Sequence, residues 1–142
     1  MQVTIQSLTR DRFESMPEAF VSIARDVPGE YWTAAHFRHD LSRKWELSLA
    51  AWHGNEPIGY AIMSSRSATW AHLHHFMLAA AWRRQGLGVR LLKQAVSRAA
   101  ETGHRLLTLK VAPGNRARLF YEREGFAHRG EDNGYLVYGL EL

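Results

Sequence analysis

Cysteine is absent from the 142-residue sequence, and no apolar run approaches the length of a membrane-spanning helix. Without cysteine the chain can form no disulfide framework, no thiolate zinc site and no cysteine nucleophile. The first residues also lack the apolar stretch of a signal peptide. These absences predict a cytoplasmic protein that has no membrane partner.

Neither sign of charge dominates the sequence. It has 18 lysines and arginines against 14 aspartates and glutamates, which gives a net charge of +4. Such an excess suits an anionic ligand, nucleic acid or simple solubility. Several basic residues gather around one glycine-rich loop, namely Arg83, Arg84, Arg90 and Lys93. This clustering favours a local anion site over an extended basic surface, and we expect no nucleic-acid partner.

Length and composition predict one domain that spans residues 1–142. Hydrophobic residues make up 46% of the sequence and charged residues 23%, which is ordinary for a globular protein. A chain of this size buries roughly 70% of the surface that its unfolded form exposes. It therefore needs neither a disulfide nor a structural metal to fold.

Hydrophobic periodicity predicts an alternation of strands and helices. Strands are expected at 3–6, 46–52, 58–63, 72–78, 106–111, 126–128 and 135–140. Helices are expected at 33–41 with Thr33 as N-cap, at 86–102 and 115–124, and as one helix or two at 11–24, where Pro17 interrupts. Hairpins at both ends and a strand–helix–strand unit between them indicate an α/β protein with a mixed sheet and helices on both faces.

The glycine-rich segment 83–88, Arg-Arg-Gln-Gly-Leu-Gly, joins the strand at 72–78 to the next helix. Gly86 and Gly88 let backbone N–H groups approach a ligand, and the helix directs its positive end to the same place. A Walker loop is excluded because Val89-Arg90 stands where that loop has lysine and Ser/Thr, and the dinucleotide fingerprint needs a third glycine. Alone, the segment fits a phosphate site and a helix start with two solvated arginines equally well.

Two sequence signatures together point to a known family. The first is the segment 83–88, and the second is Asn115 followed by Leu-Phe-Tyr-Glu-Arg-Glu-Gly-Phe at 119–126. With both, the sequence resembles the GNAT acyltransferases, the superfamily of acetyl-CoA-dependent N-acetyltransferases. It departs from the family pattern at Ala80, where a proline is usual, and at Asn115, which stands one residue closer to Tyr121 than is common.

The resemblance implies a single N-acetyltransferase domain with a GNAT-like fold, in which a mostly antiparallel central sheet has helices on both faces. It implies acetyl-CoA as co-substrate and no metal. The acceptor would be a primary amine of a small molecule or a peptide, and the C-terminal strands would allow a homodimer. A non-catalytic acyl-CoA-binding regulatory module of the same fold is the alternative.

The resemblance also implies which residues bind the cofactor. The main chain at Phe76 and Leu78 would pair with the pantetheine arm, and the fourth and fifth strands would splay apart to admit the acyl group. The pyrophosphate would lie on the loop formed by Arg83, Arg84, Gln85, Gly86, Leu87 and Gly88. Asn115 is expected to cap its helix and, with Tyr121, to line the cofactor site.

Acyl transfer from a thioester to an amine needs a neutral amine, a stabilised carbonyl oxygen and a protonated thiolate. Tyr121 is the candidate general acid, because a phenol that titrates near ~10 stays protonated at neutral pH and can serve a thiol of roughly 8.5. A core tyrosine at a helix end is the alternative interpretation. No covalent enzyme intermediate is required, which is consistent with the missing cysteine.

The general base is expected on the strand at 72–78, which carries histidines and no carboxylate. Alternation along a strand places His72 and His74 on one face and His75 on the other. Histidine has a suitable pKa for a base near pH 7, so His72 and His74 are the catalytic candidates. The alternative is that these histidines lie at the solvated start of the strand and have no role as a base. The pair could also chelate a metal, but no acidic cluster accompanies it.

The amine pocket is expected beside the first helices, where Glu30-Tyr31-Trp32, His36 and His39 lie. Aromatic rings beside a carboxylate can receive an amine by cation–π contact. Ordinary packing is the alternative, and the sequence does not name the amine.

Overall fold

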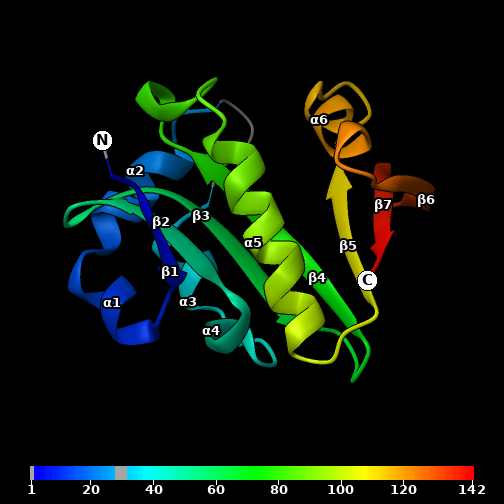
Figure 1. The fold of residues 1–142 in the computed structure, drawn as a ribbon, viewed down its shortest axis with the longest axis horizontal. Coiled ribbons are helices and arrows are strands. Elements are labelled where there is room, and N and C mark those ends of the chain that lie inside the picture. Colours follow the sequence, from blue (N-terminus) through cyan, green and yellow to red (C-terminus); the bar gives the residue numbers. More distant parts are fainter. Residues whose placement is uncertain (1, 28–31) are drawn as a thin grey trace.

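The computed structural model describes residues 2–27 and 32–142, and within them one seven-stranded sheet has the order β1-β2-β3-β4-β5-β7-β6 (Figure 1). The strands are β1 (Thr4–Ser7), β2 (Leu49–His53), β3 (Glu56–Ser65), β4 (Trp70–Leu78), β5 (Leu106–Val111), β6 (Ala127–Asp132) and β7 (Tyr135–Glu141). β4 and β5 are parallel and the other neighbouring pairs are antiparallel. The predicted mixed, mostly antiparallel sheet is confirmed.

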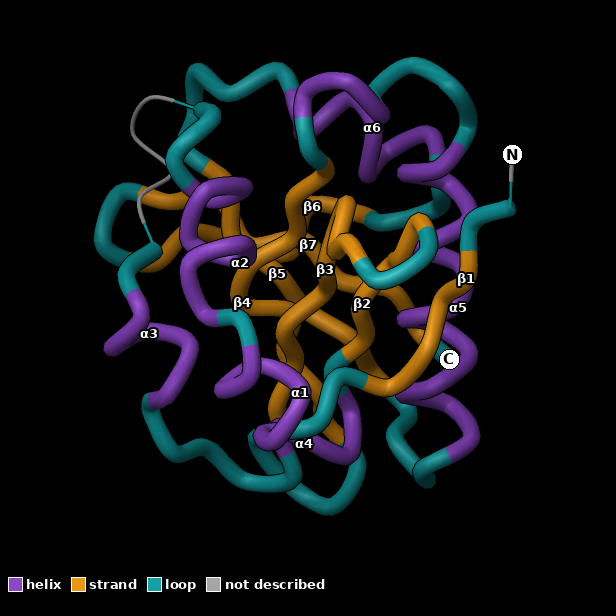
Figure 2. The backbone as a smooth tube through the Cα atoms, turned by 90° about the vertical axis from the view of Figure 1, so that its left-hand side faces the viewer, coloured by secondary structure: helices purple, strands orange, loops and turns teal. Residues whose placement is uncertain are grey.

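Helices cover both faces of this sheet (Figure 2). They are α1 (Arg10–Ser15), α2 (Pro17–Ala24), α3 (Ala34–Arg38), α4 (Lys44–Leu47), α5 (Leu87–Glu101) and α6 (Ala117–Arg123), with a 3₁₀ turn, η1, at Ala80–Trp82. On β3, Tyr60 and Ile62 pack towards α1, α2 and α3, whereas Ala61 and Met63 pack towards α5. None of the helices in the described part of the chain is long and apolar enough to cross a membrane.

Helix α5 forms because its apolar residues recur at helical spacing. The buried ones are Leu87, Leu91, Leu92, Ala95 and Ala99, and they form one stripe that packs on the sheet. Gly103, with φ of 93°, takes the left-handed conformation that ends helices, just after the C-terminal end of α5. The β4–α5–β5 unit therefore places the first turn of α5 beside the carboxyl end of β4.

The predicted N-terminal helices are confirmed with shorter bounds. Pro17 opens α2, so the segment 11–24 forms two helices. Thr33 caps α3 in a capping box with His36, as expected, but the helix ends at Arg38 and not at residue 41.

The strand predicted at 46–52 is wrong at its start, because residues 44–47 form α4 and β2 begins at Leu49. Lys44 is buried, and its ammonium donates to the carbonyls of Phe37 and His39 at the end of α3, the latter at 2.8 Å. This contact between separate segments holds α4 against α3. Hydrophobic periodicity carries no sign of it.

The feature of the sheet that matters most for function is the divergence of β4 from β5. The two strands pair from Trp70↔Leu106 to Leu73↔Leu109, and no pair follows although β4 continues to Leu78 (Figure 1). On its other side β4 pairs with β3, where the register shifts between Ile62↔His75 and Met63↔Leu73. His74 is therefore the extra residue of a β-bulge, which bends a strand and increases its twist. The gap between β4 and β5 opens at this bulge.

Candidate active site

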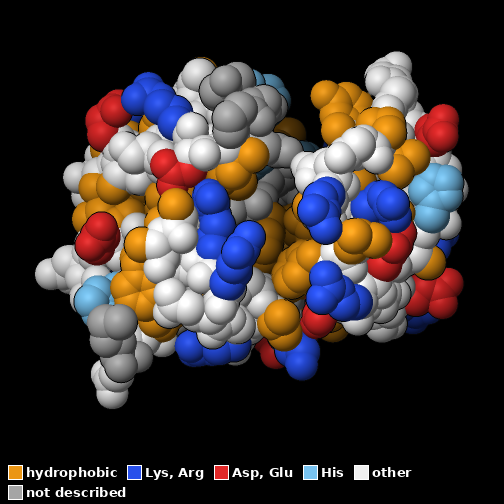
Figure 3. All heavy atoms as spheres, turned by 90° about the horizontal axis from the view of Figure 1, so that it is seen from above, with side chains coloured by type: hydrophobic (Ala, Val, Ile, Leu, Met, Phe, Trp, Pro, Cys, Tyr) orange, Lys and Arg blue, Asp and Glu red, His pale blue; other side chains and the backbone are white. Residues whose placement is uncertain are grey.

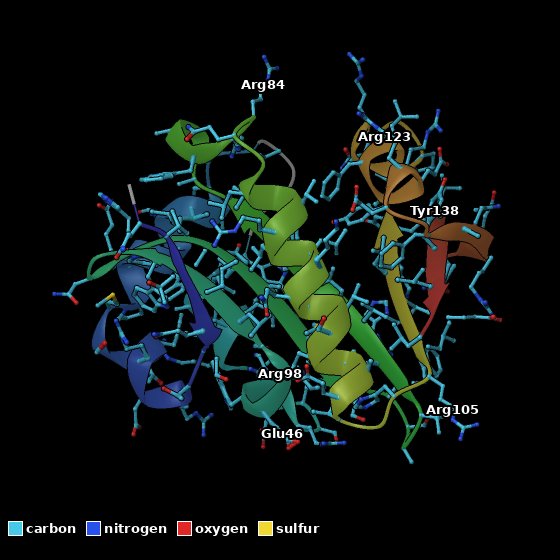
Figure 4. All side chains as sticks on the ribbon, viewed as in Figure 1. Glu46, Arg84, Arg98, Arg105, Arg123 and Tyr138 are labelled. Carbon is cyan, nitrogen blue, oxygen red and sulfur yellow. The ribbon has the colours of Figure 1, made fainter. Side chains whose placement is uncertain are left out.

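A cavity of ≈ 500 Å³ lies between the end of β4, the loop before α5, and α6. Its walls are mostly apolar, from residues such as Leu78 and Phe120, and its rim carries Arg83, Arg84 and Arg123. Seen from above, the molecule is hollowed between its two halves, with hydrophobic side chains in the hollow and Lys/Arg side chains on both sides (Figure 3). Arg84 and Arg123 stand on opposite sides of this opening (Figure 4). The cavity suits a ligand with one apolar and one anionic part.

The first turn of α5 can bind the anionic part of such a ligand. Gly86 is the N-cap, with φ of 82°, and no side chain caps the helix. The first N–H groups of the helix therefore have no capping side-chain partner, and the helix dipole adds positive potential at the same spot. Gly88 faces the cavity, because an added Cβ would lie 3.5 Å from Leu78 and 3.7 Å from Phe120. This loop fits a phosphate group.

The two arginines of the loop have different surroundings. Arg83 is half-buried: its Nε donates to the carbonyl oxygen of Leu78 at 3.1 Å, and its guanidinium lies 4.0 Å from the carboxylate of Asp26. Arg84 is exposed, with φ of 62°, and extends away from the protein (Figure 4). Arg83 therefore fixes the loop against β4, and Arg84 is the one that can follow a ligand. Gln85 donates to the carbonyl oxygen of Ala81 at 2.9 Å and stabilises the turn.

Tyr121 lies at the inner end of this cavity. It is buried, and its ring packs against Phe76, Phe120 and Phe126 at centroid distances of 6.3, 5.3 and 5.8 Å. It also lines a smaller cavity of ≈ 190 Å³ at the gap between β4 and β5. Asn115 lines this smaller cavity too, and its Oδ1 accepts the N–H of Ala117 at 2.8 Å, but the N-cap of α6 is Arg116 and not Asn115 as predicted.

A third cavity, of ≈ 460 Å³, holds all three histidines of β4: His72, His74 and His75. The prediction that His75 points to the opposite face is wrong, because the bulge at His74 interrupts the alternation of the strand. The solvated-strand interpretation fails as well, because His72 is only 5% exposed. His72 Nδ1 lies 2.7 Å from the hydroxyl of Thr108, and His74 Nε2 lies 2.6 Å from that of Ser64.

Burial changes the titration of this histidine pair. Burial lowers the pKa of His72 to about 3, and the nearby charges of Arg66 and Lys110 act in the same direction. The pKa of His74 falls to about 4 for the same reasons, with burial again the main cause. Both rings are therefore neutral at pH 7, so each offers an unprotonated nitrogen but is a weak base. Their centroids lie 4.8 Å apart, yet no group of three or more metal-binding side chains occurs among the described residues.

The residues predicted to shape the amine pocket lie in different places in the structure. Glu30 and Tyr31 lie outside the described residues. Trp32 lines the third cavity and stacks on His75, with centroids 4.7 Å apart and planes 8° from parallel. His36 belongs to the cap of α3, and the carbonyl of His39 binds Lys44.

Other residues of this cavity were not identified from the sequence. They are Arg66, Lys110, Val111, Ala112, Asp132, Asn133 and Tyr135. They come from the β3–β4 turn, the end of β5 and the β6–β7 turn, which only the folded sheet brings together. No local sequence pattern marks them.

Comparison with known proteins agrees with this geometry. Residues 7–126 match the sequence profile of the acetyltransferase (GNAT) family. The chain belongs to the GNAT family. An uncharacterized N-acetyltransferase of Methanocaldococcus jannaschii is 23% identical over 94% of this chain, which spans only 64% of that relative's length.

Two solved structures share the fold of this GNAT chain. Ard1 from Thermoplasma volcanium has a TM-score of 0.83 at 24% identity, covering 100% of this chain and 99% of its own. The PaiA N-acetyltransferase from Thermoplasma acidophilum, solved in complex with coenzyme A, has a TM-score of 0.79 at 18% identity, covering 100% of both chains.

The lowered histidine pKa values make a prediction about stability. A histidine whose pKa is lower in the folded state contributes stability that is complete above the unfolded pKa of 6.5 and is lost as pH falls towards the folded value. We expect the free energy of unfolding, measured with denaturant, to decrease between pH 6.5 and pH 4. In His72→Gln the decrease should be smaller, because the substituted side chain does not titrate.

The exposed histidine His128 provides the matched control for this measurement. The same substitution at this exposed position, His128→Gln, controls for the exchange of histidine for glutamine itself. Equal slopes for the wild type and His72→Gln would contradict the lowered pKa of His72.

Proposed function

We propose that this chain is an N-acetyltransferase that moves an acetyl group from acetyl-CoA to a primary amine by direct attack. The observation that carries the proposal is that the three cavities lie next to one another across the gap between β4 and β5. The first and second share Phe76, Met77 and Tyr121 as lining residues, and the second and third share His74, His75 and Lys110. A thioester entering from one side and an amine from the other would therefore meet in the gap.

In this proposal the loop and β4 bind the cofactor. Backbone amides from Arg84 to Gly88 hold the pyrophosphate, and the guanidinium groups of Arg84 and Arg123 add charge at the rim. The main chain at Phe76 and Leu78, on the unpaired stretch of β4, binds the pantetheine arm. The Leu78 carbonyl already accepts from Arg83, so Arg83 competes with the arm for that acceptor. The membership of the GNAT family and the fit of the cavity support acetyl-CoA as this ligand.

Tyr121 is the proposed general acid. The amine nitrogen attacks the thioester carbonyl carbon, a C–N bond forms and the C–S bond breaks. The Tyr121 hydroxyl gives its proton to the departing sulfur, which leaves as a thiol. Tyr121 is the residue suited to this step because it lines both the cofactor cavity and the gap.

His74 is the better placed of the two candidate bases, because it lines both the gap and the third cavity whereas His72 lines only the third. A base with a pKa of about 4 does not deprotonate an ammonium ion at pH 7. The amine must therefore arrive neutral. His74 can take the proton after attack, when the nitrogen is positively charged and bonded to the carbonyl carbon, which makes that proton more acidic.

The role of Tyr121 is tested by Tyr121→Phe, which removes the proton but keeps the ring. We expect kcat for thiol release from acetyl-CoA to fall by roughly 100-fold, the usual contribution of a positioned acid. The Kd for CoA, measured by calorimetry, should change little, since the aromatic packing is retained. Tyr138→Phe is the matched control, because Tyr138 is also buried but donates to Glu122 away from the cavities. Unchanged kcat in Tyr121→Phe across pH 6–9 would remove it from the mechanism.

The role of His74 is tested by the pH dependence of kcat at saturating amine. If His74 accepts the proton, the acidic limb of the wild-type profile should lie near pH 4, far below that of an ordinary histidine. His74→Gln should have a lower kcat, and its pH profile should lack this acidic limb. The profile of His72→Gln should retain the limb. A limb between pH 6 and 7 that persists in both variants would show that neither histidine is the base.

A further inference from the structure

The third cavity, where the amine would bind, carries an excess of positive charge. Arg66 from the β3–β4 turn, Lys110 from β5 and Asp132 from β6 line it together. The Lys110 ammonium lies 2.5 Å from the Asp132 carboxylate, so these two charges compensate each other. Arg66 is exposed and lies over the ring of Trp70 at 5.9 Å, and none of the ion pairs among the described residues includes it. Within the described part of the chain, Arg66 is thus a cation whose guanidinium is available to a ligand, although its charge also lowers the pKa of Asp132.

This charge extends to the place where the amine would react. After burial, the charges of Arg66 and Lys110 are among the causes that lower the pKa of both His72 and His74. The neutral histidines add no charge of their own at pH 7. A second ammonium group on the acceptor would therefore be repelled, because like charges in a partly desolvated pocket raise each other's free energy.

We infer that the acceptor is an α-amine with a carboxylate close to it, and that Arg66 binds this carboxylate. The inference rests on the proposed function and names the substrate class of the same site. A guanidinium donates two parallel hydrogen bonds to a carboxylate, so this contact would fix the orientation of the amine as well as its affinity.

The protonation state of the amine leads to the same substrate class. The α-amino group of a polypeptide has a pKa of about 7.7–8.0, whereas a lysine side chain has one of about 10.4, so this distinction applies to polypeptide N-termini. In a positive site where His72 and His74 are weak bases, the amine that loses its proton more readily reacts better. The site therefore disfavours lysine side chains and polyamines.

Two sources can supply this chemistry: a free amino acid, or a polypeptide whose first residues include Asp or Glu. The cavity, at ≈ 460 Å³, is within the usual range of small-ligand sites and admits either. The experiment compares kcat/KM for thiol release from acetyl-CoA in two arms. One arm pairs alanine with alaninamide, compared at equal concentrations of the neutral amine because the carboxylate of alanine raises the pKa of its own amine. The other uses peptides that differ only in Glu, Gln or Lys at the second position.

In at least one arm we expect kcat/KM for the acceptor that carries the carboxylate to be about tenfold higher than for its neutral counterpart. This is the usual effect of one charge-assisted contact. The arm that shows the preference identifies the source. Arg66→Gln should abolish the preference, and Arg66→Glu should reverse it towards the Lys peptide. Arg105→Gln is the matched control, because Arg105 is an exposed arginine just before β5 and does not line the third cavity.

Equal kcat/KM for acidic, neutral and basic acceptors, or a preference that survives in Arg66→Gln, would overturn this inference and leave the proposed function intact. If no amine releases thiol, the proposed function fails instead. The inference is then tested by calorimetric titration of the same acceptors into the CoA-saturated protein. About tenfold tighter binding of the acidic acceptor, lost in Arg66→Gln, would support it, and equal binding would refute it.

Discussion

Beyond Leu73 the backbone of β4 pairs with no described strand on its β5 side, and the bulge at His74 marks the point where the two strands part. In an ordinary parallel pair the backbone polar groups of both strands satisfy each other, which leaves no room for a ligand. Here the stretch from His74 to Leu78, unpaired on its β5 side, lies between the first and the third cavity. The other parts of the site lie around this gap. The N-terminus of α5 lies at one end, Tyr121 lies beside the gap, and Arg66 lies at the far end.

The two ends of the gap differ in what provides their positive charge. At the α5 end the charge is diffuse, from backbone amides, a helix dipole and the exposed Arg84 and Arg123, and it suits a polyanion. At the histidine end it comes from side chains, with Lys110 already paired to Asp132 and Arg66 left over. Between them lie neutral groups, Tyr121 and His74. This arrangement favours reactants whose anionic parts stay at the ends and whose reacting atoms in the middle are uncharged.

Features that depend on neighbouring residues were predictable from the sequence. The stripe of apolar residues on α5 and the glycines of the loop at 83–88 are local patterns, and the structure has them at the expected places. Features that depend on contacts between distant segments were not. The α4 turn needs Lys44 to reach the end of α3, and the bulge that redirects His75 needs the register of β3 against β4. For the same reason the sequence did not predict that Arg66, Lys110 and Asp132 line the third cavity, because three separate segments bring them together.

The central claim is that acetyl-CoA binds along the unpaired end of β4 with its pyrophosphate on the first turn of α5. The most direct measurement is a titration of ¹⁵N-labelled protein with acetyl-CoA, followed through backbone amide chemical shifts. We expect saturable changes that are largest at residues 84–88 and 76–78, and small changes at the β6–β7 turn. Saturation without changes at these residues, or changes centred on another basic surface, would contradict the claim.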